Sequence, residues 1–339
     1  MDMSENMELH QTENGDVQET GSRQGAGSAQ KTKSAGGGKR SYVLLIVGIV
    51  LLAASIMFSA YQYKNDYRES VEYGAQASEV KEEIKAVEAG EAAGDLEALN
   101  SRLEWLSGQK AAKEKPYAYG LTFVFFSVLL TGKGIYNLAR GVRTAKPDMK
   151  RLAQAGLLAA LCYIGFAFFK IDIPVGTEKT AFHFGNVFCV LAALLIGGFW
   201  GGLAGAVGMT VGDLTTAYVT SAPKTFLLKL LIGLIVGLVA HGIFKLSRSH
   251  DKKYIFGVTL FASICGMGFN IVADPVVGYF YKMYLLGVPQ DLAKALAKIS
   301  AVTTSVNAVV AVIAATIFYL ALRPALRKAG LFVSMDGQE

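Results

Sequence analysis

The amino-acid sequence predicts an all-α polytopic membrane protein, and three observations indicate this fold class. The chain has 339 residues, of which 52% are hydrophobic and only 18% are charged. Several uncharged runs approach the length of about 20 residues at which a helix crosses a bilayer. Basic residues gather at the ends of these runs, where Lys and Arg orient helices in a membrane. The formal charge of +6 therefore indicates membrane orientation, and nucleic acid is not an expected partner.

The chain begins with a polar tail over residues 1–40. This tail is rich in Gly, Ser and Gln and contains almost no apolar residue to bury, which is typical of a disordered segment. The apolar run over residues 41–63 predicts a transmembrane anchor helix. Because the run follows a long tail and exceeds the usual length of a signal-peptide core, an uncleaved anchor is favoured over a removed signal.

The charged segment over residues 64–116 predicts two amphipathic helices in an antiparallel hairpin. Val80, Ile84 and Val87 recur at helical spacing in its first half. The same spacing occurs in the second half, at Leu96, Leu99, Leu103 and Leu106. Glycines at the two ends of residues 90–94 favour a break between the helices. A solvated spacer without function is the alternative interpretation.

A second transmembrane helix over residues 117–139 and six further spans complete the expected topology. The six spans lie at about residues 152–169, 182–198, 200–218, 225–245, 254–281 and 299–322. They form a core over residues 150–325, which a tail over residues 326–339 follows. Because basic segments stay on the cytoplasmic side of a membrane, we expect both termini in the cytoplasm and the charged hairpin outside.

Seven polar residues are expected at one depth, in the outer half of the membrane. They are His183, Asn186, Asp213, Lys229, Asn270, Asp274 and Asn307. With about 1.5 Å of rise per residue, each lies near the outer end of its helix. An ionisable group that faces lipid at the membrane centre costs roughly 2.5 to 3.5 kcal/mol, so these residues are expected to face a shared interior.

Each of these residues also has a purely structural interpretation. His183 can extend to the membrane interface, and the asparagines of the last two helices can form hydrogen bonds across helices. Asp213, Lys229 and Asp274 can form an ion pair or triad that only stabilises the bundle. The shared depth favours a binding cavity, which suits a small, partly polar, ring-containing nutrient. Its expected flat apolar walls are Phe182, Phe184, Tyr218 and Phe226.

A stripe of glycines predicts close helix packing beside this cavity. Its members recur at intervals of 4, 3 and 4 residues and share one helix face: Gly201, Gly205, Gly208 and Gly212. Two further glycine pairs, Gly198/Gly202 and Gly233/Gly237, have the spacing at which helix backbones approach closely. These patterns indicate a tight bundle with a small cavity at one end.

The sequence also resembles a known transporter family over about residues 150–325. The motifs "FHFGN", "LAALLIGGFWGGLAGAVGMTVGDL" and "TSAPKTFLLKLLIGLIVGL" are similar to the substrate-binding S component of energy-coupling factor (ECF) transporters, in the riboflavin-transporter-type branch. The resemblance implies a six-helix bundle that binds a vitamin in its outer half. It also implies docking to a transmembrane scaffold subunit and two ATP-binding subunits.

The family docks through small residues four apart on the first core helix. Ala155 and Ala159 of "QAGLLAALCYIG" match this spacing. The two extra transmembrane helices and the external hairpin between them, residues 41–139, depart from the family pattern and leave the partner geometry open.

Energy supply and motif content decide the expected function. The chain contains no GxxxxGK[ST] phosphate-binding loop, so a separate ATPase module has to energise transport. Cys162, Cys189 and Cys265 lie within apolar runs and form no metal or disulfide pattern. We expect a multi-pass, high-affinity binding subunit for vitamin uptake in a bacterial cell membrane, without enzyme activity or cofactor. Riboflavin, pantothenate, a pyridoxine-like compound and a thiamine precursor all fit as the nutrient.

Three alternatives from other classes remain. An intramembrane enzyme would need a nucleophile, HExxH or repeated-Asp motif, and the sequence shows none of them. A sensor or structural membrane protein would use the external hairpin to bind a partner. A solitary secondary carrier would transport without an ATPase.

Overall fold

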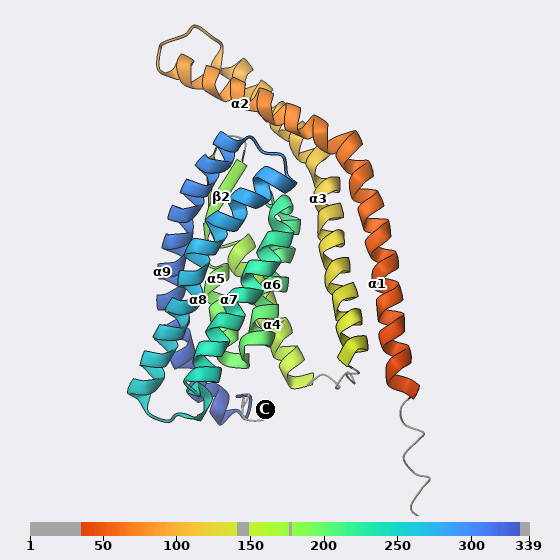
Figure 1. The fold of residues 1–339 in the computed structure, drawn as a ribbon. Coiled ribbons are helices and arrows are strands. Elements are labelled where there is room, and N and C mark those ends of the chain that lie inside the picture. The colour runs from red at the N-terminus through yellow and green to blue at the C-terminus, as the bar shows by residue number, and fades with distance from the viewer. Residues whose placement is uncertain (1–34, 141–148, 176–177, 333–339) are drawn as a thin grey trace, which may run out of the picture.

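The structure, a computed structural model, describes residues 35–140, 149–175 and 178–332. Two parts lie side by side in it (Figure 1): an N-terminal module, residues 35–140, and a core, residues 149–328. Residues 1–34 of the predicted tail, residues 141–148 and residues 333–339 lie outside the described residues. The last six residues of the predicted tail, 35–40, already belong to the first helix.

The N-terminal module is a long helical hairpin. α1 (Ala35–Gln62) continues through a π-helical turn (Tyr63–Tyr67) into α2 (Arg68–Glu88), and residues 89–95 turn the chain into α3 (Leu96–Arg140). α1 and α2 pack along successive halves of α3. The charged hairpin and its flanking spans are therefore continuous helices, and the expected boundaries at residues 63 and 116 are not breaks. In Figure 1 the α2 end of the module leans over one end of the core.

The helical spacing in the charged segment produces a small apolar seam between α2 and α3. Ala77, Val80 and Ile84 of α2 pack against Leu106 of α3. Leu99 and Leu103 are partly buried against this seam. The seam aligns the two helices beyond the apolar spans, where charged side chains cover their outer faces.

The core is a bundle of six helices with a β-hairpin inserted after the first helix. Its helices are α4 (Met149–Ala167), α5 (Gly185–Ile196), α6 (Gly198–Thr215), α7 (Ala222–Gly237), α8 (Lys252–Phe280) and α9 (Gln290–Lys328). The antiparallel hairpin joins β1 (Lys170–Val175) to β2 (Glu178–His183), with Lys170 opposite His183. α9 extends beyond residue 325, so the predicted C-terminal tail begins as helix.

Length and composition confirm the predicted membrane class. Five helical stretches in the described residues are long and apolar enough to cross a membrane: Tyr42–Glu88, Leu96–Ala139, Val219–Ile243, Lys252–Leu285 and Gln290–Lys328. α5 is a shorter apolar helix, and α4 and α6 have 19 and 18 residues. The start of α1 and the end of α9 lie at the same end of the molecule, opposite the β-hairpin (Figure 1). An even number of spans, such as the eight predicted, would place both of these ends on the same side of a membrane.

The expected helix over residues 182–198 is wrong at its start. Phe182 and His183 belong to β2, and α5 begins only at Gly185. β1 and β2 form their own ladder before the apolar run begins, so the helix cannot extend back into them. At the other end, Gly197 has a φ of 87°, which favours glycine and separates α5 from α6.

The glycine stripe of α6 lies where neighbouring helices come closest. A Cβ added at Gly201 would lie 2.3 Å from the backbone nitrogen of Ala193 in α5, and one at Gly208 would lie 2.1 Å from the carbonyl oxygen of Ala159 in α4. On the other side of α6, Gly198 and Gly202 meet Gly233 and Gly237 of α7. α6 can therefore contact three helices at backbone distance.

Candidate binding cavity

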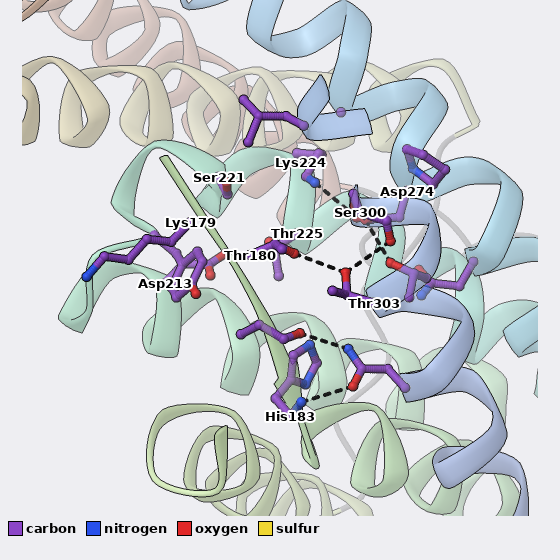
Figure 2. A pocket seen from close by; sticks show the side chains of 18 of the residues that line it. Lys179, Thr180, His183, Asp213, Ser221, Lys224, Thr225, Asp274, Ser300 and Thr303 are labelled. Carbon is purple, nitrogen blue, oxygen red and sulfur yellow. Dashed lines mark hydrogen bonds and ion pairs between the residues drawn. The ribbon is translucent and has the colours of Figure 1, made fainter. Parts of the chain in front are cut away.

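A cavity of about 110 Å³ lies at the β-hairpin end of the core. Side chains from β2, α6, α7, α8 and α9 approach it (Figure 2). The seven polar residues predicted at this depth and one predicted aromatic wall line this cavity: His183, Asn186, Asp213, Lys229, Asn270, Asp274, Asn307 and Tyr218. The structure thus brings together residues that are up to 124 positions apart in the chain.

Asp274 of α8 is held by three donors. Lys224 Nζ of α7 lies 2.9 Å from Asp274 Oδ1, while the hydroxyls of Ser300 and Thr304 of α9 donate to Oδ2 over 2.6 and 3.1 Å. Figure 2 shows Lys224 and Ser300 facing this carboxylate from two sides. Asp274 therefore ties α8 to both neighbouring helices. The expected partner, Lys229, is replaced by Lys224, which the sequence pattern did not single out.

Asp213 and Lys229 are buried, with 2% and 6% of their surfaces exposed. Among the described residues, neither side chain takes part in an ion pair. The predicted triad of Asp213, Lys229 and Asp274 is therefore not formed. Because an unpaired buried charge is costly, these two groups are candidates for contact with a polar ligand.

Several buried polar atoms of the cavity have no hydrogen-bond partner within the described protein. They are Asp213 Oδ2, Asn186 Oδ1, Asn270 Oδ1 and His183 Nδ1. A buried polar atom without a partner costs about 1 to 3 kcal/mol, and nearly all such atoms in proteins are satisfied by water or a ligand. The cavity therefore offers several acceptors to a polar ligand, beside the ammonium group of Lys229.

Asn307 of α9 uses its side-chain amide to hold β2. Its Oδ1 accepts from the backbone N–H of His183 at 3.0 Å, and its Nδ2 donates to the carbonyl oxygen of Ala181 at 3.0 Å. A hydroxyl pair, Thr180 and Thr303, spans 3.1 Å beside it. Asn307 therefore makes structural hydrogen bonds, which go to a strand and not across helices, and its contact with a ligand stays a prediction.

The aromatic walls differ from the expected set. Of the four predicted rings, only Tyr218 lines the cavity, where Phe166, Met209 and Leu296 add large apolar side chains. Phe226 packs instead on Phe126 of α3, with the ring centroids 4.9 Å apart. Phe182 precedes His183 on β2, where neighbouring side chains point to opposite faces. Phe184 lies beyond the strand and is exposed.

The cavity also contains polar residues that were not predicted. They are Lys179, Thr180, Ser221, Lys224, Thr225, Lys282, Ser300, Thr303 and Thr304. A signal for some of them exists in the sequence. Ser300, Thr303, Thr304 and Asn307 recur at the spacing of one helix face in α9. A polar stripe on an otherwise apolar helix therefore marks a cavity wall.

Of the two alanines predicted to dock a partner, Ala155 is buried and Ala159 is partly buried against the core. Ala155 has 7% of its surface exposed and belongs to the core, and the carbonyl oxygen of Ala159 meets α6 at Gly208. Gly156 and Ala160 have the same four-residue spacing and are exposed. A Cβ added at Gly156 would meet nothing within 4 Å. Spacing alone does not distinguish these two faces, which lie about 100° apart on a helix.

Residues 146–324 match the family model described as "ECF-type riboflavin transporter, S component". The match covers more than half of the chain, from just before α4 to near the end of α9, and it leaves out the N-terminal module. No curated protein and no solved structure matches the chain.

Proposed function

The chain belongs to the family of S components of ECF-type riboflavin transporters, and from this premise we propose that it binds riboflavin or a closely related vitamin for uptake. An S component is the binding part of a transporter and not an enzyme. The binding site proposed is the cavity that Asp213, Lys229 and Asn270 line.

The unpaired acceptors of the cavity carry this proposal. Asp213 Oδ2, Asn186 Oδ1 and Asn270 Oδ1 require donors, and a flavin with a polyhydroxylated side chain supplies both O–H and N–H groups. Its ring carbonyls can accept from Lys229, while Phe166 and Tyr218 offer aromatic faces for the ring. A hydrocarbon ligand would leave these polar atoms unsatisfied.

Uptake further requires partners, because the chain has no phosphate-binding loop of its own. We infer a transmembrane scaffold subunit and two ATP-binding subunits in a bacterial cell membrane, with both termini of this chain in the cytoplasm. The start of α1 and the end of α9 lie at the same end of the molecule. This arrangement supports a common side of the membrane for both termini. The outward face of α4 at Gly156 and Ala160 is the proposed docking contact.

Two measurements on the purified full-length protein test the ligand. Native mass spectrometry from mild detergent should show a copurified flavin, and titration with riboflavin should give saturable one-to-one quenching of flavin fluorescence. Binding of thiamine or pantothenate without flavin binding would assign another nutrient. Absence of any vitamin in both measurements would contradict the proposed function.

A further inference from the structure

Lys110 of α3 reaches from the N-terminal module into the core. Its Nζ lies 2.6 Å from Glu178 Oε1 in β2, and Glu178 Oε2 lies 3.1 Å from Lys282 Nζ, beyond α8. The three side chains are largely buried, with 14 to 17% of their surfaces exposed. Lys282 lines the binding cavity. Two consecutive ion pairs thus connect the module with the cavity wall.

The charge state of Glu178 makes this connection strong at neutral pH. Burial alone would raise the pKa of this carboxyl, but the ammonium groups of Lys282 and Lys110 outweigh burial and lower its pKa to about 2. Loss of one partner from a buried ion pair leaves an uncompensated charge, which is strongly destabilising.

Two tyrosines of the module hold the segment that follows Lys282. The hydroxyl of Tyr67 donates to the carbonyl oxygen of Leu286, and that of Tyr117 donates to the carbonyl oxygen of Leu285 over 3.3 Å. The two rings lie against each other, with centroids 4.3 Å apart. The module therefore contacts both β2 and the connection between α8 and α9.

A second cavity of about 260 Å³ lies between the module and the core. On the module side it is lined by α2 and α3, including Ser107 and Lys110, and on the core side by Pro174, Glu178 and Lys179. Lys179 lines both cavities, so they adjoin each other. Figure 1 shows the module leaning over this end of the core.

We propose that the N-terminal module caps the binding cavity and that Lys110 is a positioning residue, which through Glu178 holds Lys282 in the cavity wall and β2 over the cavity. A ligand then enters and leaves through the chamber beneath the module. This inference rests on the proposed function in one respect only, that the cavity is the ligand site.

The first test compares two lysines on the same face of α3, in the full-length protein with riboflavin as the probe. Lys110→Met removes the ammonium group that reaches the core. Lys113→Met is the matched control, because Lys113 pairs with Asp66 and Glu69 inside the module, at 3.1 and 2.9 Å. We expect at least tenfold faster riboflavin dissociation from Lys110→Met, a less than twofold change in Lys113→Met, and rescue by Lys110→Arg.

The second test needs no ligand. Ala297 lines the cavity. The variant Ala297→Cys therefore reports how fast a membrane-impermeant maleimide reaches the cavity. Labelling of the native cysteines is measured separately and subtracted. Labelling should become at least tenfold faster when Lys110→Met is added and should not change with Lys113→Met. Tyr117→Phe, which removes one hydroxyl, should act in the same direction if Lys110→Met does not fold.

The two tests separate the two proposals. Faster maleimide labelling in a protein that binds no riboflavin would retain the cap and refute the proposed ligand. Riboflavin binding with equal dissociation and labelling rates in the Lys110, Lys113 and Tyr117 variants would retain the function and overturn the cap.

Discussion

At the scale of single residues, some charged groups of the cavity have ion-pair and hydrogen-bond partners, whereas others have no ion pair among the described residues. Asp274 is fully engaged by Lys224, Ser300 and Thr304, which makes it part of the scaffold. Asp213 and Lys229 are buried without an ion pair among the described residues. The expected division of roles follows from this difference: Asp274 stabilises the bundle, whereas Asp213 and Lys229 contact the ligand.

Substitution of the two unpaired groups should therefore weaken binding without unfolding the protein. We expect Asp213→Asn and Lys229→Met to lower riboflavin affinity by more than tenfold, because a hydrogen bond to a charged group contributes about 1.5 to 3 kcal/mol. Fluorescence titration measures the affinity, and size-exclusion chromatography confirms a monodisperse protein. Asp291→Asn is the control, since the Asp291 side chain is 99% exposed. Unchanged affinity in both cavity variants would assign Asp213 and Lys229 to a structural role.

The lowered pKa of Glu178 predicts a pH window for its ion pairs. A carboxyl whose pKa falls from 4.5 to about 2 on folding contributes stability that is present above pH 4.5 and is lost as the pH falls towards 2. Lys110, Glu114 and Lys282 are the charged groups around it. The difference in unfolding temperature between wild type and Glu178→Gln should therefore stay constant from pH 8 to pH 5 and shrink below about pH 4. A difference that already changes between pH 7 and pH 5 would show a raised pKa, and one that stays constant down to pH 2 would show an ordinary pKa.

At the scale of elements, α6 is the helix on which the core depends most. Gly205 faces α5 so closely that an added Cβ would lie 2.3 Å from Cys189 Sγ. We expect Gly205→Leu to lower the unfolding temperature and riboflavin binding together, because neither α5 nor α6 can move aside in a packed bundle. Gly257→Leu in α8 should leave both unchanged, since a Cβ there meets nothing within 4 Å. Equal effects of the two substitutions, measured by thermal unfolding, would contradict this account.

The outward face of α4 has a separate prediction. Gly156→Trp and Ala160→Trp should retain riboflavin affinity in the isolated protein, because both positions are exposed, and should abolish uptake and copurification of the ATP-binding subunits. Ala155→Trp serves as the contrast, since this buried position should lose stability as well. Normal uptake by both outward-face variants, or accumulation of riboflavin without an ATPase partner, would favour a solitary carrier.

At the scale of the whole molecule, the module and the core are expected to share one membrane orientation. The α2 end of the module and the β-hairpin lie at the end opposite the start of α1 and the end of α9 (Figure 1). In intact cells, Gly94→Cys should react with an impermeant thiol reagent, whereas Ala329→Cys should react only after permeabilisation. The reverse pattern would invert the proposed topology, because positively charged loops would then lie outside.

The sequence by itself determined the membrane class, most of the helices and part of the residues that line the cavity. Apolar run length predicts a span directly, and the cost of an ionisable group in lipid places Asp213, Lys229 and Asp274 in the interior without any knowledge of their neighbours. The glycine spacing in α6 predicted a close-packed face for the same reason, because a helix face depends only on local geometry.

Only the tertiary structure decided which partner each side chain meets. Lys224 and Lys229 lie on the same helix, and rotation of α7 against α8 determines which of them reaches Asp274. Likewise, α4 presents Ala155 inward and Gly156 outward, although both belong to pairs of small residues four apart. The bridge from Lys110 through Glu178 to Lys282 joins three segments distant in the chain. Spacing along one segment determines a helix face, whereas the contacts of that face depend on how separate segments pack.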